Sequence, residues 1–262
     1  MRRWPTFSCF LACVQGVLAQ APNIAERFQV PHGCARVETG AGSFGAFLRS
    51  LPLKPPGSPV LLHDGRKKPR QDVHAAVIDM SVGDRDLQQC ADAVMRLRAE
   101  YLFAAGRQDE IAFDFTNGFR AEWKRWRQGD RIWCDGRRCA WRRAATADSS
   151  HAQLQRFLET VFMYAGTLSL SRELIDASGL PLEPGDVFIR GGSPGHAMIV
   201  VDAARTGDGR TFFLLAQSYM PAQEIHIARN ARTPMGAWHE LEGEQLRTPE
   251  WTFAWSERKR WR

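Results

Sequence analysis

The 262-residue chain lacks most of the features that mark fibrous, disordered or membrane-embedded proteins. Its 22 glycines and 14 prolines are too few for a collagen-like or low-complexity chain, and no internal repeat is visible. Only the first twenty residues contain a long apolar run, which excludes a polytopic membrane protein. Hydrophobic residues make up 44% of the chain and charged residues 24%, as in a globular protein long enough to bury a core.

A clear excess of one charge is also missing. The formal net charge is +6, and without residues 1–19 the remaining 33 basic and 29 acidic residues leave +4. The terminal segment Glu257–Arg262 contributes +3 of this, and elsewhere both signs are mixed along the sequence. A nucleic-acid-binding protein is expected to gather its basic residues on one face or helix. We therefore expect no nucleic acid as the main partner.

The N-terminus has the pattern of an export signal. Met1-Arg2-Arg3 is a short basic start, Phe7 to Leu18 is mostly apolar, and Ala19 follows as a small residue at a cleavage site. The apolar stretch is shorter than the roughly 20 residues that a transmembrane helix needs. We expect a signal peptide over residues 1–19 and an exported mature chain, periplasmic or secreted, without a transmembrane segment. A buried first helix and a lipoprotein box at Leu11-Ala12-Cys13 are the alternatives.

Four cysteines remain in the mature chain, in a compartment that favours disulfides. Cys134 and Cys139 flank an Asp135-Gly136 turn signal, so we expect a hairpin tip closed by a disulfide. So short a closed loop stabilises by only about 2 kcal/mol in chain-entropy models. Zinc is the alternative, but no second Cys/His pair stands at finger spacing. Cys34 and Cys90 either bond to each other or leave at least one free thiol.

Residue patterns along the chain indicate an α+β protein. Helices are expected at Ser43–Ser50, from Asp84 or Asp86 to about Ala105, at Phe119–Arg127 and at His151–Tyr164. Strands are expected at Val73–Met80, Ile111–Phe115, Val187–Arg190, His196–Asp202, Thr211–Gln217 and Gln223–Ala228, with the hairpin over Asp130–Arg142. Helices first and antiparallel strands afterwards are typical of this class. Because nothing resembles an interdomain linker, residues 20–262 are expected to form one domain.

The most informative stretch runs from Gly185 to Asp202. A glycine-rich loop, Gly191–Gly195, delivers a lone histidine, His196, to the first position of an apolar strand. Glycines at this place, Gly195 among them, would let a substrate backbone approach closely, and a rigid strand would fix the imidazole. Histidine is the side chain suited to proton transfer near neutral pH. The alternative is a strand-end histidine that is hydrogen-bonded to backbone.

This stretch carries a resemblance to a known group of enzymes. Pro184-Gly-Asp-Val-Phe, followed by Gly195-His-Ala-Met-Ile-Val-Val-Asp, is similar to the histidine strand of papain-like cysteine amidohydrolases of the NlpC and CHAP type. The resemblance implies an antiparallel sheet packed against helices, with insertions, and a nucleophilic cysteine on an upstream helix. Cys90 is the only mature cysteine on a clear upstream helix.

A second resemblance covers most of the mature chain. The sequence is similar to a bacterial exported family known only as a domain of unknown function (number 4846). Four segments carry this likeness: Asp86–Leu102, Tyr164–Leu170, Gly185–Asp202 and Leu215–His226.

In the implied chemistry the Cys90 thiolate is the nucleophile, and the His196 imidazole holds the proton and later protonates the leaving amine. If Asp84 caps the helix, however, Cys90 lies in its second turn, whereas the resembled enzymes place the cysteine at the helix start. Cys90 also shares an apolar face with Val94, Leu97 and Tyr101. A buried, inert cysteine is therefore the alternative.

A third residue should orient the imidazole. Asp202 shares a strand face with His196 but lies about 20 Å away along the strand. A hairpin turn centred between Gly207 and Asp208 would place Tyr219 opposite His196 and Gln217 diagonal to it, and a slip of one residue would present Ser218 instead. We favour Gln217, because polar side chains occupy the equivalent place in the resembled enzymes. Gln89 is a candidate oxyanion donor, and Gly195, Ser218 and Tyr219 are candidate substrate-binding residues.

Other patterns are weaker. His63, Asp64 and His74 have irregular spacing for a metal site, so we expect no metal and no cofactor. The clustered tryptophans are more typical of packing than of sugar binding. Together, these patterns predict an exported cysteine amidohydrolase or peptidase that acts on an amide of the cell envelope, possibly a peptidoglycan peptide. The alternative is a non-catalytic envelope-binding protein on the same scaffold, with Cys90 in its core.

Overall fold

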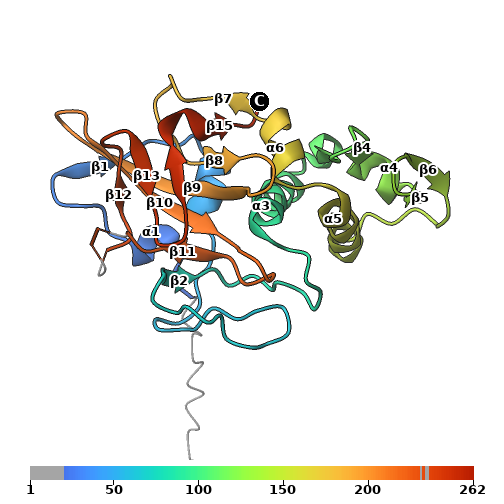
Figure 1. Ribbon diagram of the computed structural model, residues 1–262, viewed down its shortest axis with the longest axis horizontal. Coiled ribbons are helices and arrows are strands. Elements are labelled where there is room, and N and C mark those ends of the chain that lie inside the picture. Colours follow the sequence, from blue (N-terminus) through green and yellow to red (C-terminus); the bar gives the residue numbers. More distant parts are fainter. Residues whose placement is uncertain (1–20, 231, 234–235) are drawn as a thin grey trace, which may run out of the picture.

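Strands from both ends of the chain are joined in one antiparallel sheet. The computed structural model describes residues 21–230, 232–233 and 236–262, so the predicted signal peptide lies outside the described residues. In spatial order the main strands are β2 (His74–Val77), β11 (His226–Ala228), β10 (Thr211–Gln217), β9 (His196–Thr206), β8 (Val187–Arg190), β15 (Arg258–Arg260) and β7 (Ile175–Asp176). Two short strands join at its side, β1 (Cys34–Arg36) on β9 and β12 (His239–Glu240) on β10. The protein is thus a mixed structure of antiparallel sheets and few helices (Figure 1).

Helices and smaller hairpins surround this sheet. The α-helices are α1 (Ile24–Arg27), α2 (Phe44–Arg49), α3 (Cys90–Ala104), α4 (Trp123–Arg127), α5 (His151–Tyr164) and α6 (Thr167–Glu173). Two short 3₁₀-helices are η1 (Gln108–Glu110) and η2 (Trp255–Glu257). The two-stranded sheets are β3 (Ala112–Asp114) with β4 (Arg120–Glu122), β5 (Asp130–Cys134) with β6 (Cys139–Arg143), and β13 (Gln245–Arg247) with β14 (Thr252–Ala254).

The central strands β8, β9 and β10 are buried on both faces, which explains why they are largely apolar. Along β9, Ala197, Ile199 and Val201 belong to the core that includes α3. The alternate residues Met198 and Val200 belong to a second core, which includes side chains of β13 and β14. The first position of β9, His196, therefore lies at the edge between a helix-covered face and a hairpin-covered face.

A buried carboxylate ties the N-terminal segment to the middle of β9. Asp202 has no exposed surface and accepts hydrogen bonds from Arg36 Nε (2.8 Å) and Arg49 Nε (2.5 Å). These contacts hold β1 and α2 against the strand. Asp202 therefore has a structural role far from the start of β9.

The segment from β3 to α5 extends away from the large sheet (Figure 1). At its far end β5 and β6 form the predicted hairpin, and the Cys134–Cys139 disulfide is confirmed. Cys34 and Cys90 are both free. Cys34 pairs with Thr206 at one end of β9, whereas Cys90 contacts Ala197 at the other, so about 30 Å of strand separates them.

Several predicted elements differ at their boundaries. The helix expected at Phe119–Arg127 begins only at Trp123, because Arg120–Glu122 pairs with β3 and buries Ala121. The bounds of α5, β8 and β10 agree with the prediction, whereas α6 was missed. None of the helices in the described ranges has the length and apolar character needed to cross a bilayer.

Candidate functional site

A pocket of about 480 Å³ opens where α3 and β9 begin. Its walls include Gln89 and Cys90 from the start of α3, Gly195 and His196 from the start of β9, and Tyr219 beyond β10. Thr167 of α6 and Trp251 before β14 also line it. The structure therefore brings together, in one solvent-accessible cavity, a thiol and an imidazole that are far apart in the sequence.

Cys90 is the first residue of α3, and the expectation that it lies in the second turn is wrong. The helix starts later than predicted because the carboxylate of Asp86 accepts from the backbone N–H of Ala222 (2.6 Å) instead of capping a helix. The cap comes from within the helix, where Asp92 Oδ2 accepts from the backbone N–H of Gln89 (2.9 Å). Cys90 thus stands at the positive end of a 15-residue helix.

The electrostatic environment of the thiol is mixed. Burial dominates and raises the pKa of Cys90 to about 11, although hydrogen bonding from the backbone N–H of Ala197 acts to lower it. The N–H groups of Cys90 and Ala91 at the helix start also act to lower this pKa. At neutral pH the sulfur is therefore a thiol that faces several donors able to stabilise a thiolate.

The imidazole of His196 is held by stacking and by one side-chain hydrogen bond. Its ring lies against Tyr219 (4.9 Å between centroids), Trp251 (5.2 Å) and Phe253 (6.0 Å). Its Nε2 is 2.8 Å from Gln217 Oε1. Burial is the main reason that the pKa of His196 falls to about 4, so the ring is neutral at pH 7.

The neighbours of Gln217 determine which way its amide points. Its Nε2 donates to Glu250 Oε2 (2.8 Å), and an ionised carboxylate can only accept. Its second N–H points to His226 Nε2 (3.2 Å). His226 Nδ1 lies 2.9 Å from the carbonyl of Glu224, to which it donates, so His226 Nε2 is an acceptor. Both amide hydrogens are therefore used away from His196, and Oε1 faces its ring.

This orientation selects the tautomer of His196. Because Gln217 Oε1 accepts, His196 Nε2 carries the proton and Nδ1 is left as the basic nitrogen. Nδ1 has no hydrogen-bond partner within the described part of the chain, and the ring lines the pocket that contains Cys90. A histidine whose basic nitrogen is free of hydrogen bonds in the described structure thus lines the same pocket as the thiol.

Lys68 and Glu250 were not found from the sequence. Lys68 Nζ lies 2.7 Å from Glu250 Oε1, and both side chains are nine-tenths or more buried. The ion pair anchors the carboxylate that orients Gln217. Both residues lie in irregular segments far from Gln217 in the chain, and no motif marked either of them.

A β-bulge decides that Gln217, not Ser218, meets His196. The hairpin begins with Thr211 opposite Arg205, and the register shifts by one residue between Leu214 and Leu215. Beyond this shift Ala216 is opposite Ile199, a register that continues to Tyr219 opposite His196. If the same residues paired without the shift, Ser218 would take the diagonal position that Gln217 holds.

The remaining predicted site residues are divided between the pocket and its supports. Gln89 lines the pocket, and its Nε2 is 3.3 Å from Asp86 Oδ1. Tyr219 lines the pocket and stacks on His196.

Ser218 is fully buried, and its hydroxyl lies 2.7 Å from the carbonyl of Gln223 and 2.9 Å from that of Gln88. Ser218 therefore links the end of β10 to the start of α3 and does not line the pocket.

Gly195 lines the pocket, but its lack of a side chain serves the protein's own packing. A Cβ atom there would lie 2.3 Å from the carbonyl oxygen of Gly192 and 2.5 Å from Thr167 Oγ1. The close approach expected for a substrate backbone is thus made by the loop itself, against α6.

Asp92 is a pocket residue that sequence reasoning missed. It lies two residues after Cys90, and burial raises its pKa to about 8. Its Oδ1 has no hydrogen-bond partner among the described residues. At neutral pH the carboxyl is therefore mostly protonated, and it adds little negative charge beside the thiol.

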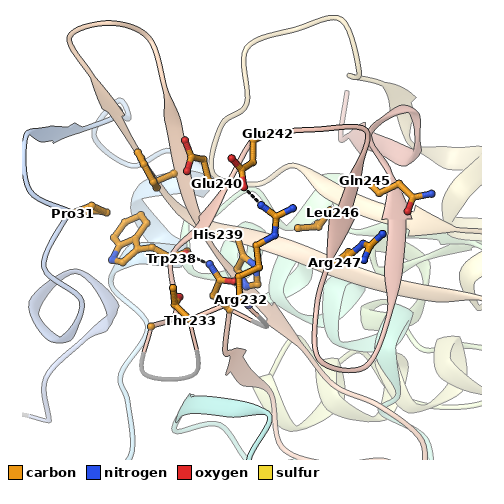
Figure 2. A pocket seen from close by; sticks show the side chains of 13 residues that line it. Pro31, Arg232, Thr233, Trp238, His239, Glu240, Glu242, Gln245, Leu246 and Arg247 are labelled. Carbon is orange, nitrogen blue, oxygen red and sulfur yellow. Dashed lines mark hydrogen bonds and ion pairs between the residues drawn. The ribbon is translucent and has the colours of Figure 1, made fainter.

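A second pocket, of about 360 Å³, lies beside β12 and β13 (Figure 2). Arg232 forms an ion pair with Glu242 across it, and Asn230 Nδ2 donates to the carbonyl of Trp238 (2.7 Å). His239 is buried there, and desolvation lowers its pKa to about 4. Because the described lining residues include no cysteine, the pocket at the start of β9 is the better candidate site.

The architecture and the site define a class: a mixed α and β protein with a cysteine and a histidine in one pocket at the edge of an antiparallel sheet. Residues 24–260 match the model of a family described as a domain of unknown function (4846), and the chain belongs to this family. No curated protein and no solved structure matches the chain.

Proposed function

We propose that this protein is an exported cysteine amidohydrolase or peptidase that acts on an amide of the cell envelope, such as a peptidoglycan peptide. In this proposal Cys90 is the nucleophile, His196 the general base and Gln217 the residue that orients it. The fold would be an elaborated papain-like one of the NlpC and CHAP type, with the segment from β3 to α5 as an insertion. The observation that carries the proposal is the shared pocket of a helix-start cysteine and a histidine whose tautomer is selected by Gln217.

The proposed chemistry begins from a neutral pair. His196 Nδ1 takes the proton of the Cys90 thiol as the sulfur attacks the substrate carbonyl carbon. The resulting oxyanion would accept from backbone N–H groups at the start of α3, with the Gln89 amide as a further donor. The imidazolium then protonates the leaving amine as the C–N bond breaks, which leaves a thioester. A water molecule that gives its proton to His196 hydrolyses this thioester and restores the thiol.

The raised pKa of Cys90 requires that proton transfer and attack be coupled. A thiol with a pKa of about 11 and an imidazole with a pKa of about 4, lining one pocket, do not form a resting ion pair. The imidazolium would gain stability only once the negative oxyanion forms near it. His196 therefore acts as a base during the attack, not before it.

The test uses the expected mature chain, residues 20–262, and purified peptidoglycan fragments. Products are identified by mass spectrometry for the wild type, Cys90→Ala, His196→Ala and a Cys34→Ser control. Loss of new amine termini in the first two variants, with the control unchanged, supports the proposal. Hydrolysis that persists in Cys90→Ala would exclude Cys90 as the nucleophile.

The burial that raises the pKa of Cys90 also favours a second candidate, a non-catalytic envelope-binding protein. In that case Cys90 is a packing residue and the pocket holds a ligand without cleaving it. Retention of the same fragments by the immobilised protein, measured beside their cleavage, separates the two, because a binding protein retains the fragments unchanged and Cys90→Ala leaves retention intact.

A further inference from the structure

The positive charge of this chain is concentrated in one short segment, contrary to the mixed distribution expected from the sequence. Residues 120–143 contain nine basic and three acidic residues, a net of +6 that equals the net charge of all 262 residues. This segment forms β4, α4, β5 and β6. The rest of the chain is therefore neutral overall.

Part of this charge lies on the outer face of the β5–β6 hairpin and at its tip. Arg131 is directly opposite Arg142, a pairing of like charges that is unfavourable in a two-stranded sheet. Arg142 lies over the ring of Trp133 (4.0 Å) and Arg131 over that of Trp126 (4.4 Å). Because Arg142 is exposed, stacking holds its guanidinium plane and leaves its edge N–H groups to solvent.

Five of the nine basic residues of this segment form ion pairs within the protein: Arg120, Lys124, Arg125, Arg127 and Arg143. Asp130 lies near Arg125 (3.2 Å) and Arg143 (3.7 Å). In contrast, Arg137, Arg138 and Arg142 form no ion pair within the ranges that the structure describes, and all three are exposed. The opposite face of the hairpin packs Ile132, the disulfide and Trp141 against the core, so the charged face cannot turn inward.

The position of the hairpin makes this face accessible. β5 and β6 lie at the end of the molecule remote from the large sheet (Figure 1). The Cys134–Cys139 disulfide closes the tip next to Arg137 and Arg138. Trp133 on the same face is 43% exposed. A rigid tip therefore presents unpaired arginines together with an exposed indole.

We propose that the outer face of the β5–β6 hairpin docks on anionic lipid headgroups. Arginines that lack carboxylate partners match the phosphates of such a surface, and tryptophan is the side chain that favours the headgroup level of a bilayer. The face is a short hairpin with one exposed indole. It has neither the recognition helix nor the stacking platform by which proteins bind nucleic acid. The proposal is independent of any activity at Cys90.

Vesicle sedimentation tests this surface. The chain over residues 20–262 is mixed either with vesicles of phosphatidylcholine alone or with vesicles that also contain phosphatidylglycerol. We expect binding only to the anionic vesicles and a marked loss at high salt. The triple variant R137Q/R138Q/R142Q should bind about 100-fold more weakly, since each arginine near an anionic surface contributes about fivefold.

A matched variant and two soluble probes complete the experiment. K67Q/R210Q/R262Q removes the same number of exposed charges elsewhere and should bind like the wild type. An equal loss of vesicle binding in both triple variants would mean that the net charge alone causes binding, and it would overturn the proposal. Absence of binding to the anionic vesicles would overturn it as well. Competition by millimolar inorganic phosphate, or tighter binding to a short DNA duplex than to vesicles, would also overturn it. Circular dichroism checks that both variants are folded.

Discussion

Glu250 Oε2 accepts a hydrogen bond from Gln217 Nε2 at 2.8 Å, and this contact determines the chemistry of a second residue, His196. Because the carboxylate can only accept, it turns the amide oxygen of Gln217 toward His196. The imidazole then holds its proton on Nε2. A glutamate that does not line the pocket thereby determines which ring nitrogen of a pocket histidine is basic.

Glu250→Gln should release this constraint. The new amide can donate as well as accept, so the Gln217 amide can flip and present its NH₂ to His196. We expect a measurable population of the Nδ1–H tautomer of His196 in E250Q, detected from the imidazole ¹⁵N shifts by two-dimensional NMR. E240Q, which alters a partly exposed carboxylate paired with Arg210, is the control. An unchanged tautomer in E250Q would show that His226 alone orients Gln217.

Cys90 should be alkylated slowly at neutral pH and steadily faster as the pH rises. With the thiol pKa near 11, the thiolate fraction grows about tenfold per pH unit between 7 and 10. The measurement is the iodoacetamide rate in a Cys34→Ser background, where Cys90 is the remaining free thiol among the described residues. In urea the rate of the same thiol should level off near pH 9. A native rate that is already constant by pH 7 would mean a resting thiolate–imidazolium pair.

The stability of the Asp92→Asn variant relative to the wild type should increase as the pH rises. Burial raises the native pKa of Asp92 to about 8, so between pH 5 and 8 the native state holds a proton that the unfolded chain has released. The free energy of unfolding of the wild type therefore falls in this window, by up to about 1.4 kcal/mol per pH unit from this group. The substituted asparagine does not titrate, and its oxygen can still accept from Gln89. Urea unfolding of both proteins at pH 5, 6.5 and 8 measures the difference between their free energies of unfolding. This difference should not change with pH if Asp92 is ionised in the folded protein.

Gly195→Ala should destabilise the protein and disturb His196. The added methyl group meets a backbone carbonyl at 2.3 Å, so the loop before β9 must move, at a cost of about 1–3 kcal/mol. We expect a lower urea midpoint together with altered His196 ring shifts. Gly207→Ala is the matched control, because nothing lies within 4 Å of the corresponding Cβ position. Wild-type stability in G195A would restore the idea that Gly195 makes room for a substrate.

Features set by neighbouring residues in the chain could be predicted from the sequence, whereas features set by contacts between distant residues could not. The apolar periodicity of α5 and the continuous apolar runs of β8 and β10 are local, and these bounds agreed with the structure. The start of α3 was misplaced because Asp86, a good capping residue, is instead bonded to Ala222, 136 residues away. Glu250 and Lys68 escaped notice for a similar reason, since only the folded chain brings their segments to Gln217.

Because of the β-bulge between Leu214 and Leu215, deleting one residue has different effects at different positions of this hairpin. Val201 is the residue of β9 that has no partner on β10. Deleting it would let the two strands pair without interruption and would keep Tyr219 opposite His196. Losing one codon at Ala216, beyond the irregularity, would instead advance β10 and bring a hydroxyl, in place of an amide, beside the imidazole. Relatives that keep the site should therefore vary in strand length at the first of these positions and not at the second.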